Sequence, residues 1–363
     1  MIIKMILTNS FSPDVRVFKE AKYLTSKGHD VEIICWAKTP QKGLPKEEKI
    51  ENVKVRRFGI PSVEGTGWKQ IGAYKSYIGE CKKYLKNITY DILHCHDMDG
   101  AIVGYLCRKK FIFDMHEFYD KGNKVRKFVS HVIVRHLSKK SIANIYVSNQ
   151  NLKVYGKGLE SKFFVLKNYV DASMFDGCEK TESEHLRVSY IGRVRNQIPE
   201  FAALFEAVKD LDDVEVNIYG DGPDLKKLTS MAEGKNNIVV HGGFNGAYES
   251  KRIYNNTDVS FIAYDPSNPN YQGDFEPVKF YEAIFTKTPI IATESLKLGK
   301  YVSTKNIGIA VDTRSEEKIR EAIISFRDNS DFRKQAKENM EKLAGKYDWG
   351  NAVKILDEIY DRV

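Results

Sequence analysis

Short runs of β-branched and other apolar residues alternate with amphipathic stretches along almost the whole chain. This alternation is typical of βαβ units, in which helices cover a parallel sheet. It predicts strands in the N-terminal half at residues 2–9, 30–37, 54–60, 91–97, 111–117 and 144–149. A second series is predicted at residues 186–192, 215–220, 237–242, 258–264, 289–293 and 307–311. The expected fold class is therefore α/β, with two successive Rossmann-like domains.

The two series of strands are separated by a polar stretch at residues 178–185. A chain of 363 residues also favours two domains, at roughly 150 residues for each. We expect an N-terminal domain over 1–171, a linker over 172–186 and a C-terminal domain over 187–343. The remaining segment, 344–363, ends in a predicted helix whose apolar face needs a partner, so we expect it to pack back on the N-terminal domain.

The cysteines and the hydropathy of the chain indicate a compartment. The five cysteines are scattered and form no C-x-x-C pair, which predicts free thiols, a reducing cytoplasm and no structural zinc. No run approaches the roughly 18 consecutive apolar residues of a spanning helix, and the first residues read as a strand rather than as a signal peptide. We therefore expect a cytoplasmic protein, which can also attach peripherally to the inner face of the membrane.

The charge of the chain is unevenly distributed. Residues 1–177 contain 31 basic and 18 acidic residues, whereas residues 178–363 contain 26 and 31. The basic half predicts an anionic partner. Much of its charge lies in two predicted helices, 69–86 and 124–140, which either cover the sheet with their apolar faces or lie on an anionic membrane surface. No helix-turn-helix, zinc finger or aromatic RNA-binding signature accompanies the charge, so nucleic acid is not an expected partner.

The segment GDFEPVKFYEA, at residues 273–283, predicts a loop that enters a helix at Pro277. The N–H groups of the first helical turn can bind phosphate, and Lys279 adds a positive charge there. We expect these free backbone N–H groups to be those of Val278, Lys279 and Phe280. Glu282, one turn further, can accept hydrogen bonds from ribose hydroxyls, and Asp274 precedes the turn. The alternative is an amphipathic helix in which Glu282 faces solvent.

The spacing from Asp274 to Glu282 resembles the E-x7-E region of the family 4 retaining glycosyltransferases, in the branch that reads P-x-K-x-x-E. Other landmarks lie in the family's order at 13–36, 91–97, 113–117, 165–171, 190–193, 218–223 and 239–244. The resemblance implies two Rossmann domains that face each other across a cleft, the glycosyltransferase-B type. It also implies a donor held mainly by the C-terminal domain, an acceptor held by the N-terminal one, and transfer with retention and no bound metal.

The resemblance also assigns roles in donor binding. Glu282 matches the acid that binds ribose, and Asp274 stands where the family usually has a Glu that holds sugar hydroxyls. Because Asp is one methylene shorter, Glu276 is an alternative for this contact. Arg193, directly after Gly192, matches the Arg that neutralises the donor diphosphate.

One part of the family's diphosphate site has no counterpart. The family commonly carries a Lys shortly after the Arg, whereas this chain reads VRNQIPE at residues 194–200. Arg195 or Lys279 can supply the missing charge.

In the N-terminal domain, His116 ends a predicted strand, at the sheet edge where open α/β sheets bind ligands. A His at this position contacts the donor sugar in the resembling enzymes; otherwise it is a structural residue. In HCHDMDG, at residues 94–100, His94 and His96 share one strand face and Cys95 points away. We expect His96 and Asp97 to line the acceptor side of the cleft, as an alternative to a metal site. We also expect Asp99 to cap the next helix. Arg16, in the first βα turn, is a further acceptor-side candidate.

These observations predict a glycosyltransferase that moves a sugar from a UDP- or GDP-linked donor to a glycan or a lipid-linked acceptor of cell-surface polysaccharide biosynthesis. His116, Asp274 and Arg193 are the predicted catalytic residues, and no cofactor or metal is expected. The alternatives are a non-hydrolysing nucleotide-sugar epimerase and a non-catalytic member that binds nucleotide sugars or glycans.

Overall fold

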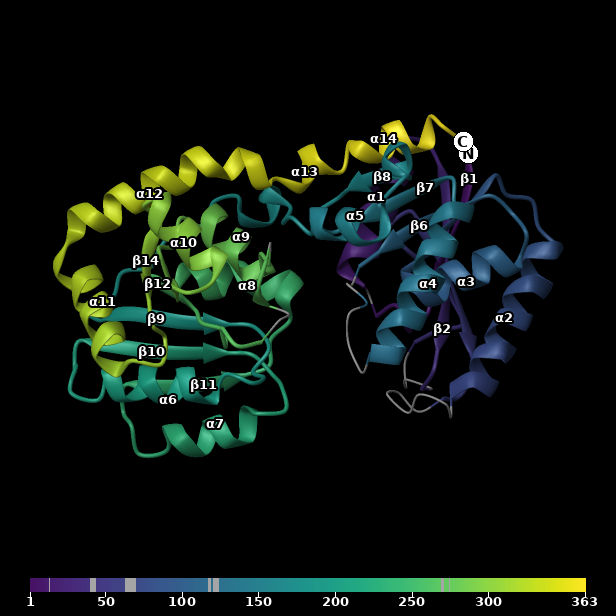
Figure 1. Ribbon diagram of the computed structural model, residues 1–363. Helices are drawn as coiled ribbons and strands as arrows, with labels where there is room; N and C mark the ends of the chain where they lie inside the picture. The colour runs from purple at the N-terminus through teal and green to yellow at the C-terminus, as the bar shows by residue number, and fades with distance from the viewer. Residues whose placement is uncertain are drawn as a thin grey trace. The chain divides into compact units, whose positions relative to one another are not determined.

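The computed structural model describes residues 1–12, 14–39, 44–62, 70–116, 119, 124–268, 271–273 and 275–363. This part of the chain forms two compact units (Figure 1). Unit 1 comprises Met1–Asn168 and Ala352–Val363, and unit 2 comprises Tyr169–Asn351. The division after Asn168 precedes the expected linker at 172–186, and the chain returns to unit 1 at Ala352, within the expected C-terminal segment 344–363.

Unit 1 is built on a single sheet with the strand order β3-β4-β2-β1-β5-β6-β7-β8. All neighbouring strands are parallel except β3 and β4, which are antiparallel. The strands are β1 Ile2–Leu7, β2 Asp30–Ala37, β3 Glu47–Ile50, β4 Val53–Gly59, β5 Ile92–His96, β6 Phe111–Met115, β7 Ala143–Tyr146 and β8 Phe163–Val165. The two edge strands, β3 and β8, were not predicted, because the first is mostly charged and the second has only three residues.

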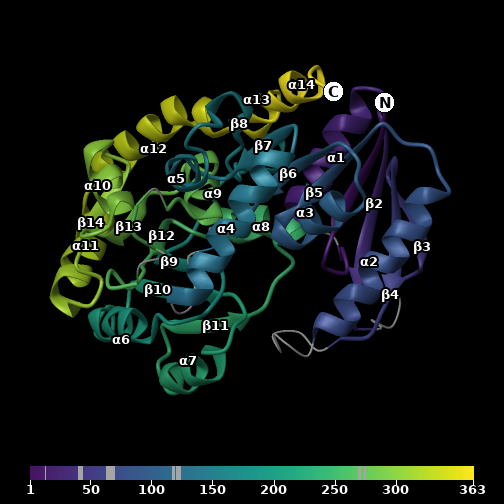
Figure 2. The same ribbon diagram turned by 45° about the vertical axis from the view of Figure 1, so that its right-hand side comes forward.

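Helices cover both faces of this sheet. One face is covered by α2 (Ile71–Lys86), α3 (Asp97–Leu106) and α4 (Lys124–Lys140) (Figure 2). Alternate strand residues, such as Ile34, Leu93 and Phe113, pack with residues of these helices in one apolar cluster. The residues between them face α1 (Val15–Ser26), which begins at Asp14, whose side chain accepts a hydrogen bond from the Val17 N–H. A further helix, α5 (Asn149–Tyr155), follows β7.

The C-terminal segment completes unit 1. The predicted last helix is broken into α13 (Trp349–Ala352) and α14 (Ile355–Tyr360). Leu356 and Ile359 of α14 are fully buried, and the Tyr360 hydroxyl lies 2.9 Å from Nδ1 of His94. Asp357 accepts hydrogen bonds from Tyr23 and Lys27 of the α1 region. The last helix therefore covers the N-terminal residues of the chain within this unit.

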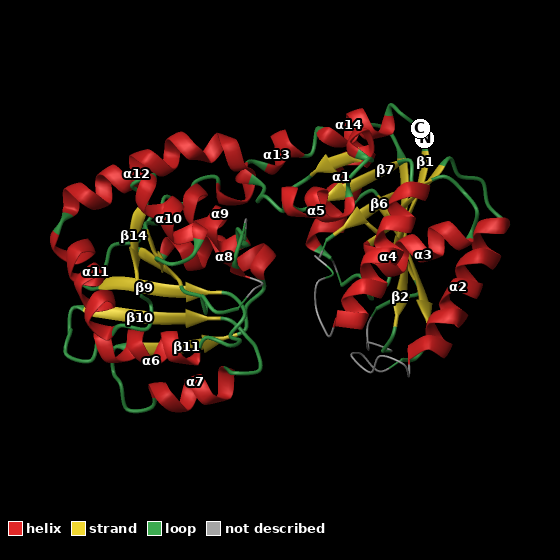
Figure 3. Cartoon of the chain, in the orientation of Figure 1, coloured by secondary structure: helices red, strands yellow, loops and turns green. Residues whose placement is uncertain are grey.

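Unit 2 is a six-stranded parallel sheet with the order β11-β10-β9-β12-β13-β14 (Figure 3). Its strands are β9 Leu186–Ile191, β10 Val214–Tyr219, β11 Ile238–Gly242, β12 Val259–Ile262, β13 Ile290–Thr293 and β14 Gly308–Val311. Its helices are α6 Ile198–Ala207, α7 Leu225–Ala232, α8 Gly246–Asn255, α9 Val278–Phe285, α10 Lys297–Thr304, α11 Glu316–Asp328 and α12 Ser330–Ala344. The predicted class, α/β with two parallel-sheet domains, is confirmed.

Strand order fixes where each sheet can bind a ligand. In unit 1 the order reverses between β1 and β5, and in unit 2 it reverses between β9 and β12. Crevices form outside the carboxyl ends of strands at such reversals, which is where ligands bind in open α/β sheets. His116 follows β6 and Arg193 follows β9, so both predicted residues lie at carboxyl edges.

Among the described residues, no helix is long and apolar enough to cross a membrane.

Candidate functional site

The carboxyl edge of unit 2 is shaped by glycines. Gly192 has a φ of 143° and Gly220 a φ of 157°, in the region that favours glycine. A Cβ atom on Gly220 would lie 1.7 Å from the Gly192 carbonyl oxygen, so the ends of β9 and β10 meet backbone against backbone. The N–H groups of Gly192 and Val194 donate to the carbonyls of Tyr219 and Asp221 at 2.9 and 3.0 Å. This contact holds the start of the loop that carries Arg193.

Lys279 lies beneath this loop, in the first turn of α9. Its side chain is only 7% exposed, and its Nζ atom is 3.6 Å from the ring centroid of Tyr190 and 5.3 Å from that of Tyr264. A Cβ atom on Gly192 would lie 2.9 Å from this Nζ, so the glycine makes room for the ammonium. Nζ has no hydrogen-bond partner among the described residues. Burial, opposed by the charge of Glu282, lowers the pKa of Lys279 to about 7.

Glu282 lies one turn further along α9. Its two carboxylate oxygens are 3.4 Å from the Ser250 hydroxyl and 3.3 Å from the Tyr254 hydroxyl. Burial raises the pKa of Glu282 to about 7, against the hydrogen bond from Tyr254 and the charge of Lys279. The carboxyl group is thus half-buried among hydroxyls, and the alternative in which Glu282 merely faces solvent does not describe this position.

The remaining predicted donor residues divide into two groups. Arg193, Arg195 and Val278 are exposed at the same edge, and Pro277 is the N-cap residue of α9. Asp274 lies outside the described residues.

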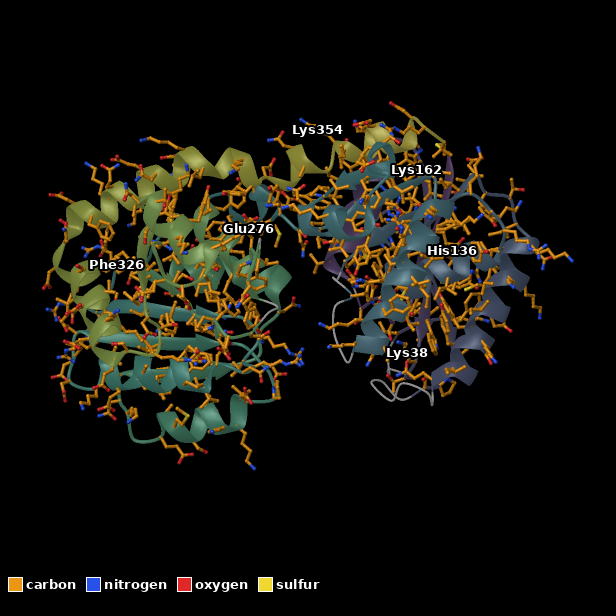
Figure 4. The ribbon with its side chains drawn as sticks, viewed as in Figure 1. Lys38, His136, Lys162, Glu276, Phe326 and Lys354 are labelled. Atoms are coloured by element: carbon orange, nitrogen blue, oxygen red, sulfur yellow. The ribbon has the colours of Figure 1, made fainter. Side chains whose placement is uncertain are left out.

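One expectation about the α9 region is corrected. The Phe280 N–H donates to the Pro277 carbonyl at 2.9 Å, so it is not one of the free donors of the first turn. Glu276, labelled in Figure 4, was an alternative for the Asp274 contact. Its carboxylate accepts a hydrogen bond of 2.7 Å from the buried Tyr281 hydroxyl, and it stays an alternative for that contact.

In unit 1, His116 lies at the edge of a cluster of buried polar side chains that includes His96 and Asp114. Its Nε2 atom lies 3.1 Å from Nδ1 of His96 and 3.6 Å from Oδ2 of Asp114. Its backbone N–H donates to Asp97 at 3.1 Å. Although burial alone lowers it, the nearby Asp114 carboxylate raises the pKa of His116 overall. His116 is the part of this cluster that reaches the surface, with 14% of its side chain exposed.

The structure corrects two acceptor-side predictions, because Arg16 and His96 lie inside unit 1. Arg16 is 5% exposed, and its guanidinium contacts Glu20 at 3.1 Å and Asp114 at 3.2 Å and donates to the Leu166 carbonyl at 2.9 Å. His96 is fully buried behind His116. Both side chains therefore support the cluster from within.

Asp97 is the acceptor-side candidate that remains partly exposed. It has a φ of 59° and accepts a hydrogen bond of 3.0 Å from the Tyr119 hydroxyl. The N-cap of α3 is His96, with no side-chain cap, so the expected capping role of Asp99 is wrong.

The buried cluster also has the composition of a metal site. Ligand atoms of Glu20, His94, His96 and Asp114 all lie within 4.8 Å of one another. The Arg16 guanidinium, however, already contacts both carboxylates. Burial and the charge of Asp114 raise the pKa of Glu20 well above its ordinary value, whereas Arg16 holds that of Asp114 well below. The guanidinium therefore already supplies a positive charge to these two carboxylates, which a metal ion would otherwise do.

A hollow of about 600 Å³ lies at the carboxyl ends of β2 and β4 in unit 1. Glu80 of α2 forms part of its wall, beside Arg57 and Lys46. Sequence reasoning did not single out these residues, because they come from three separate elements.

Asp114 and Tyr190 are the supporting residues that sequence reasoning missed. Asp114 had a readable signal, because it is a charged residue inside the otherwise apolar run FIFDM of β6. Tyr190 had none, since tyrosine is common in strands and only the fold brings it to Lys279.

Two sequence families match this chain. Residues 14–173 match the family described as Glycosyltransferase Family 4, and residues 179–343 match that described as Glycosyl transferases group 1. No curated protein matches the sequence.

Solved structures match over the whole length. Sucrose-phosphate synthase from Thermosynechococcus elongatus has a TM-score of 0.77 at 14% identity, covering 100% of this chain and 98% of that one. A glycosyltransferase from Rickettsia africae has a TM-score of 0.70 at 18% identity, with coverages of 99% and 97%. Anabaena HepE, in complex with UDP and glucose, has a TM-score of 0.69 at 14% identity, with coverages of 99% and 99%. At these identities the similarity establishes the fold.

Proposed function

Since this chain is a family 4-like glycosyltransferase with the glycosyltransferase-B fold, we propose that it transfers a hexose, with retention, from a UDP- or GDP-linked donor to a glycan or a lipid-linked acceptor. Anabaena HepE has been solved with UDP and with UDP-glucose, which supports a nucleotide sugar as the donor. The proposal assigns the donor to unit 2 and the acceptor to unit 1.

The observation that carries the donor assignment is the ammonium of Lys279, buried without a hydrogen-bond partner among the described residues at the point where the unit 2 sheet reverses. A buried cation is costly unless a negative charge accompanies it. Arg193 is exposed at the same edge, and α9 begins there with its positive dipole end. These groups together suit a diphosphate, and Lys279, rather than the exposed Arg195, takes the role of the Lys that the family carries after its Arg.

The same arrangement suggests how transfer proceeds. When the bond between the anomeric carbon and the phosphate oxygen breaks, the leaving nucleoside diphosphate gains negative charge, which Lys279 and Arg193 stabilise. Because these two side chains supply the positive charge, we expect full activity in the presence of EDTA. His116, held by Asp114, is assigned to the reacting end of the sugar, and Glu282 to the ribose hydroxyls. Asp274 keeps its predicted place beside the sugar as part of this proposal.

On the acceptor side, the excess of basic residues in the first half of the chain suits an anionic or phosphate-linked glycan precursor. The hollow beside β2 and β4 is our candidate for the acceptor, since Lys46 contributes to its wall. Asp97 is assigned to the same side.

Glu282→Ala is expected to weaken nucleotide-sugar binding about tenfold, because an acceptor of ribose hydrogen bonds is lost. Isothermal titration with UDP- and GDP-linked sugars measures this change. Glu338→Ala, which removes an exposed acid from α12, is the matched control and should bind as the unaltered protein does. Equal affinities for all three proteins would remove Glu282 from the donor site.

A thermal-shift panel of nucleotide diphosphates and their sugars, followed by product analysis with and without acceptor, tests the activity itself. Sugar transfer supports the proposal. An epimer formed from UDP-N-acetylglucosamine alone, or tight binding without transfer or hydrolysis, would overturn it in favour of an epimerase or a binding protein.

A further inference from the structure

Helix α4 turns an apolar stripe toward solvent. Four large apolar side chains on it are strongly exposed: Val125 at 72%, Phe128 at 70%, Val129 at 47% and Val132 at 53%. Their spacing of three, four and seven residues places them on one helix face. The opposite face, with Val134 and Leu137, is buried in the core of unit 1. The packing of α4 against the core of unit 1 therefore does not use this exposed stripe.

The apolar surface continues from α4 onto the end of α3. Tyr105 and Leu106 are exposed there, and the ring of Tyr105 meets that of His136 edge-on at 5.1 Å. His136, labelled in Figure 4, lies one helical turn after Val132 on α4. The surface thus spans two helices, and we call it the α3–α4 patch: Tyr105, Leu106, Val125, Phe128, Val129 and Val132.

Exposed basic residues lie at both ends of α4 and directly after α3. Lys124 lies exposed at the start of α4, Lys139 and Lys140 lie exposed at its end, and α3 is followed by the exposed run 108–110, which reads RKK. Residues 105–110 and 124–140 contain no acidic residue. The two segments that form the patch therefore carry exposed basic residues and no acidic ones.

Helix α2, the other basic helix, has a different surface. Its apolar residues Tyr77, Cys81 and Leu85 are buried against the sheet. Its outer face carries Lys82, Lys83 and other polar residues. Of the two predicted basic helices, 69–86 and 124–140, only the second therefore remains a candidate for contact with a membrane. Helix α4 offers a continuous stripe of apolar side chains for insertion, and the described part of α2 does not.

We propose that the α3–α4 patch is a docking surface for an anionic lipid bilayer, with Phe128 and the three valines among the acyl chains and the neighbouring basic residues at the phosphates. Charge favours this occupant over a second copy of the chain, since pairing two identical patches would bring like charges together. Four exposed aliphatic and aromatic side chains also do not suit the backbone of a nucleic acid. The surface goes beyond donor binding and is tested separately from it.

The test is sedimentation with vesicles of phosphatidylcholine containing about 30% phosphatidylglycerol, at about 50 and 300 mM salt. The unaltered protein should bind these vesicles more tightly than pure phosphatidylcholine, and added salt should weaken the binding. The variant Val125→Ser/Phe128→Ser/Val129→Ser/Val132→Ser should lose at least tenfold in vesicle affinity. Val239→Ser, which changes an exposed valine on β11 of unit 2, is the control and should bind normally.

Two further measurements keep the result interpretable. Nucleotide binding and the unfolding temperature of the quadruple variant should equal those of the unaltered protein, which separates this surface from the donor site. Phe128→Trp should show a blue-shifted emission on addition of anionic vesicles. Unchanged vesicle binding by the quadruple variant, or a dimer that this variant dissociates without any vesicle binding, would overturn the proposal.

Discussion

Lys279→Met is expected to lower kcat/KM for sugar transfer by roughly 10²–10³, which is the typical loss when one charge-stabilising group is removed from an active site. Methionine can fill the space against Tyr190 and Tyr264 but carries no charge. The same change should raise the free energy of unfolding, since it removes a buried amine that has no hydrogen-bond partner among the described residues and whose protonation is opposed by burial. Activity and stability should therefore move in opposite directions.

Steady-state kinetics and urea unfolding measure these two effects. Lys300→Met, in an exposed position on α10, is the control and should leave both unchanged. If Lys279→Met retained full activity, or lost both activity and stability, Lys279 would be a structural residue.

The pKa of Lys279 also gives donor binding a pH dependence. Because that pKa is about 7, the amine of the empty site is mostly neutral above pH 7 and must gain a proton to meet a diphosphate. The dissociation constant should then rise about tenfold for each pH unit above 7, until the pKa of the bound state is reached. Titration in buffers of different ionisation enthalpy should detect proton uptake on binding at about pH 8.

Glu282, whose pKa also lies near 7, titrates in the same range, so the two groups need to be separated. Glu282→Gln keeps the shape of the side chain and should retain the rise of the dissociation constant above pH 7. Lys279→Met should abolish it. A pH-independent affinity in the unaltered protein would contradict the assignment of Lys279 to the diphosphate.

The sequence predicted the sheets better than the surroundings of charged residues. Strand positions follow from local runs such as DVEIICWA at 30–37, which became β2. The start of α9 also followed from local signals, since Pro277 is its N-cap. The burial of Lys279 could not be predicted, because it depends on Tyr190 and Tyr264, which only tertiary packing brings to it.

The partner of Arg16, like the burial of Lys279, could not be predicted from local sequence. In sequence it stands beside a loop, where a cation can reach a ligand. Its actual partner, Asp114, lies 98 residues away on β6, and the register of β5 against β6 pairs His96 with Asp114 beside it. A charged residue can be placed on a strand or a helix from local pattern, but whether it is neutralised depends on contacts between distant segments.

Arg16→Met is expected to destabilise the protein by about 3–5 kcal/mol, because removal of one partner leaves the other charge buried and unpaired. Asp114 is fully buried, and although burial raises its pKa, the charge of Arg16 is the largest influence that holds it well below the ordinary value of 3.8. Lys54→Met is the matched control: Lys54 pairs with Asp30 at 2.8 Å on the surface, and its loss should cost at most about 1 kcal/mol.

The destabilisation should itself depend on pH. In the unaltered protein, the depressed pKa of Asp114 contributes stability that is present above pH 3.8 and is lost as the pH falls below it. In Arg16→Met that contribution is missing, so the difference in the free energy of unfolding between the two proteins should narrow toward acid pH.

The double variant Arg16→Met/Asp114→Asn should recover part of the lost stability at about pH 7, since no unpaired charge remains. Urea unfolding between about pH 3 and pH 8 checks all three expectations. A loss no larger than that of Lys54→Met would mean that Asp114 does not depend on Arg16, and the guanidinium would again be available for an anionic acceptor.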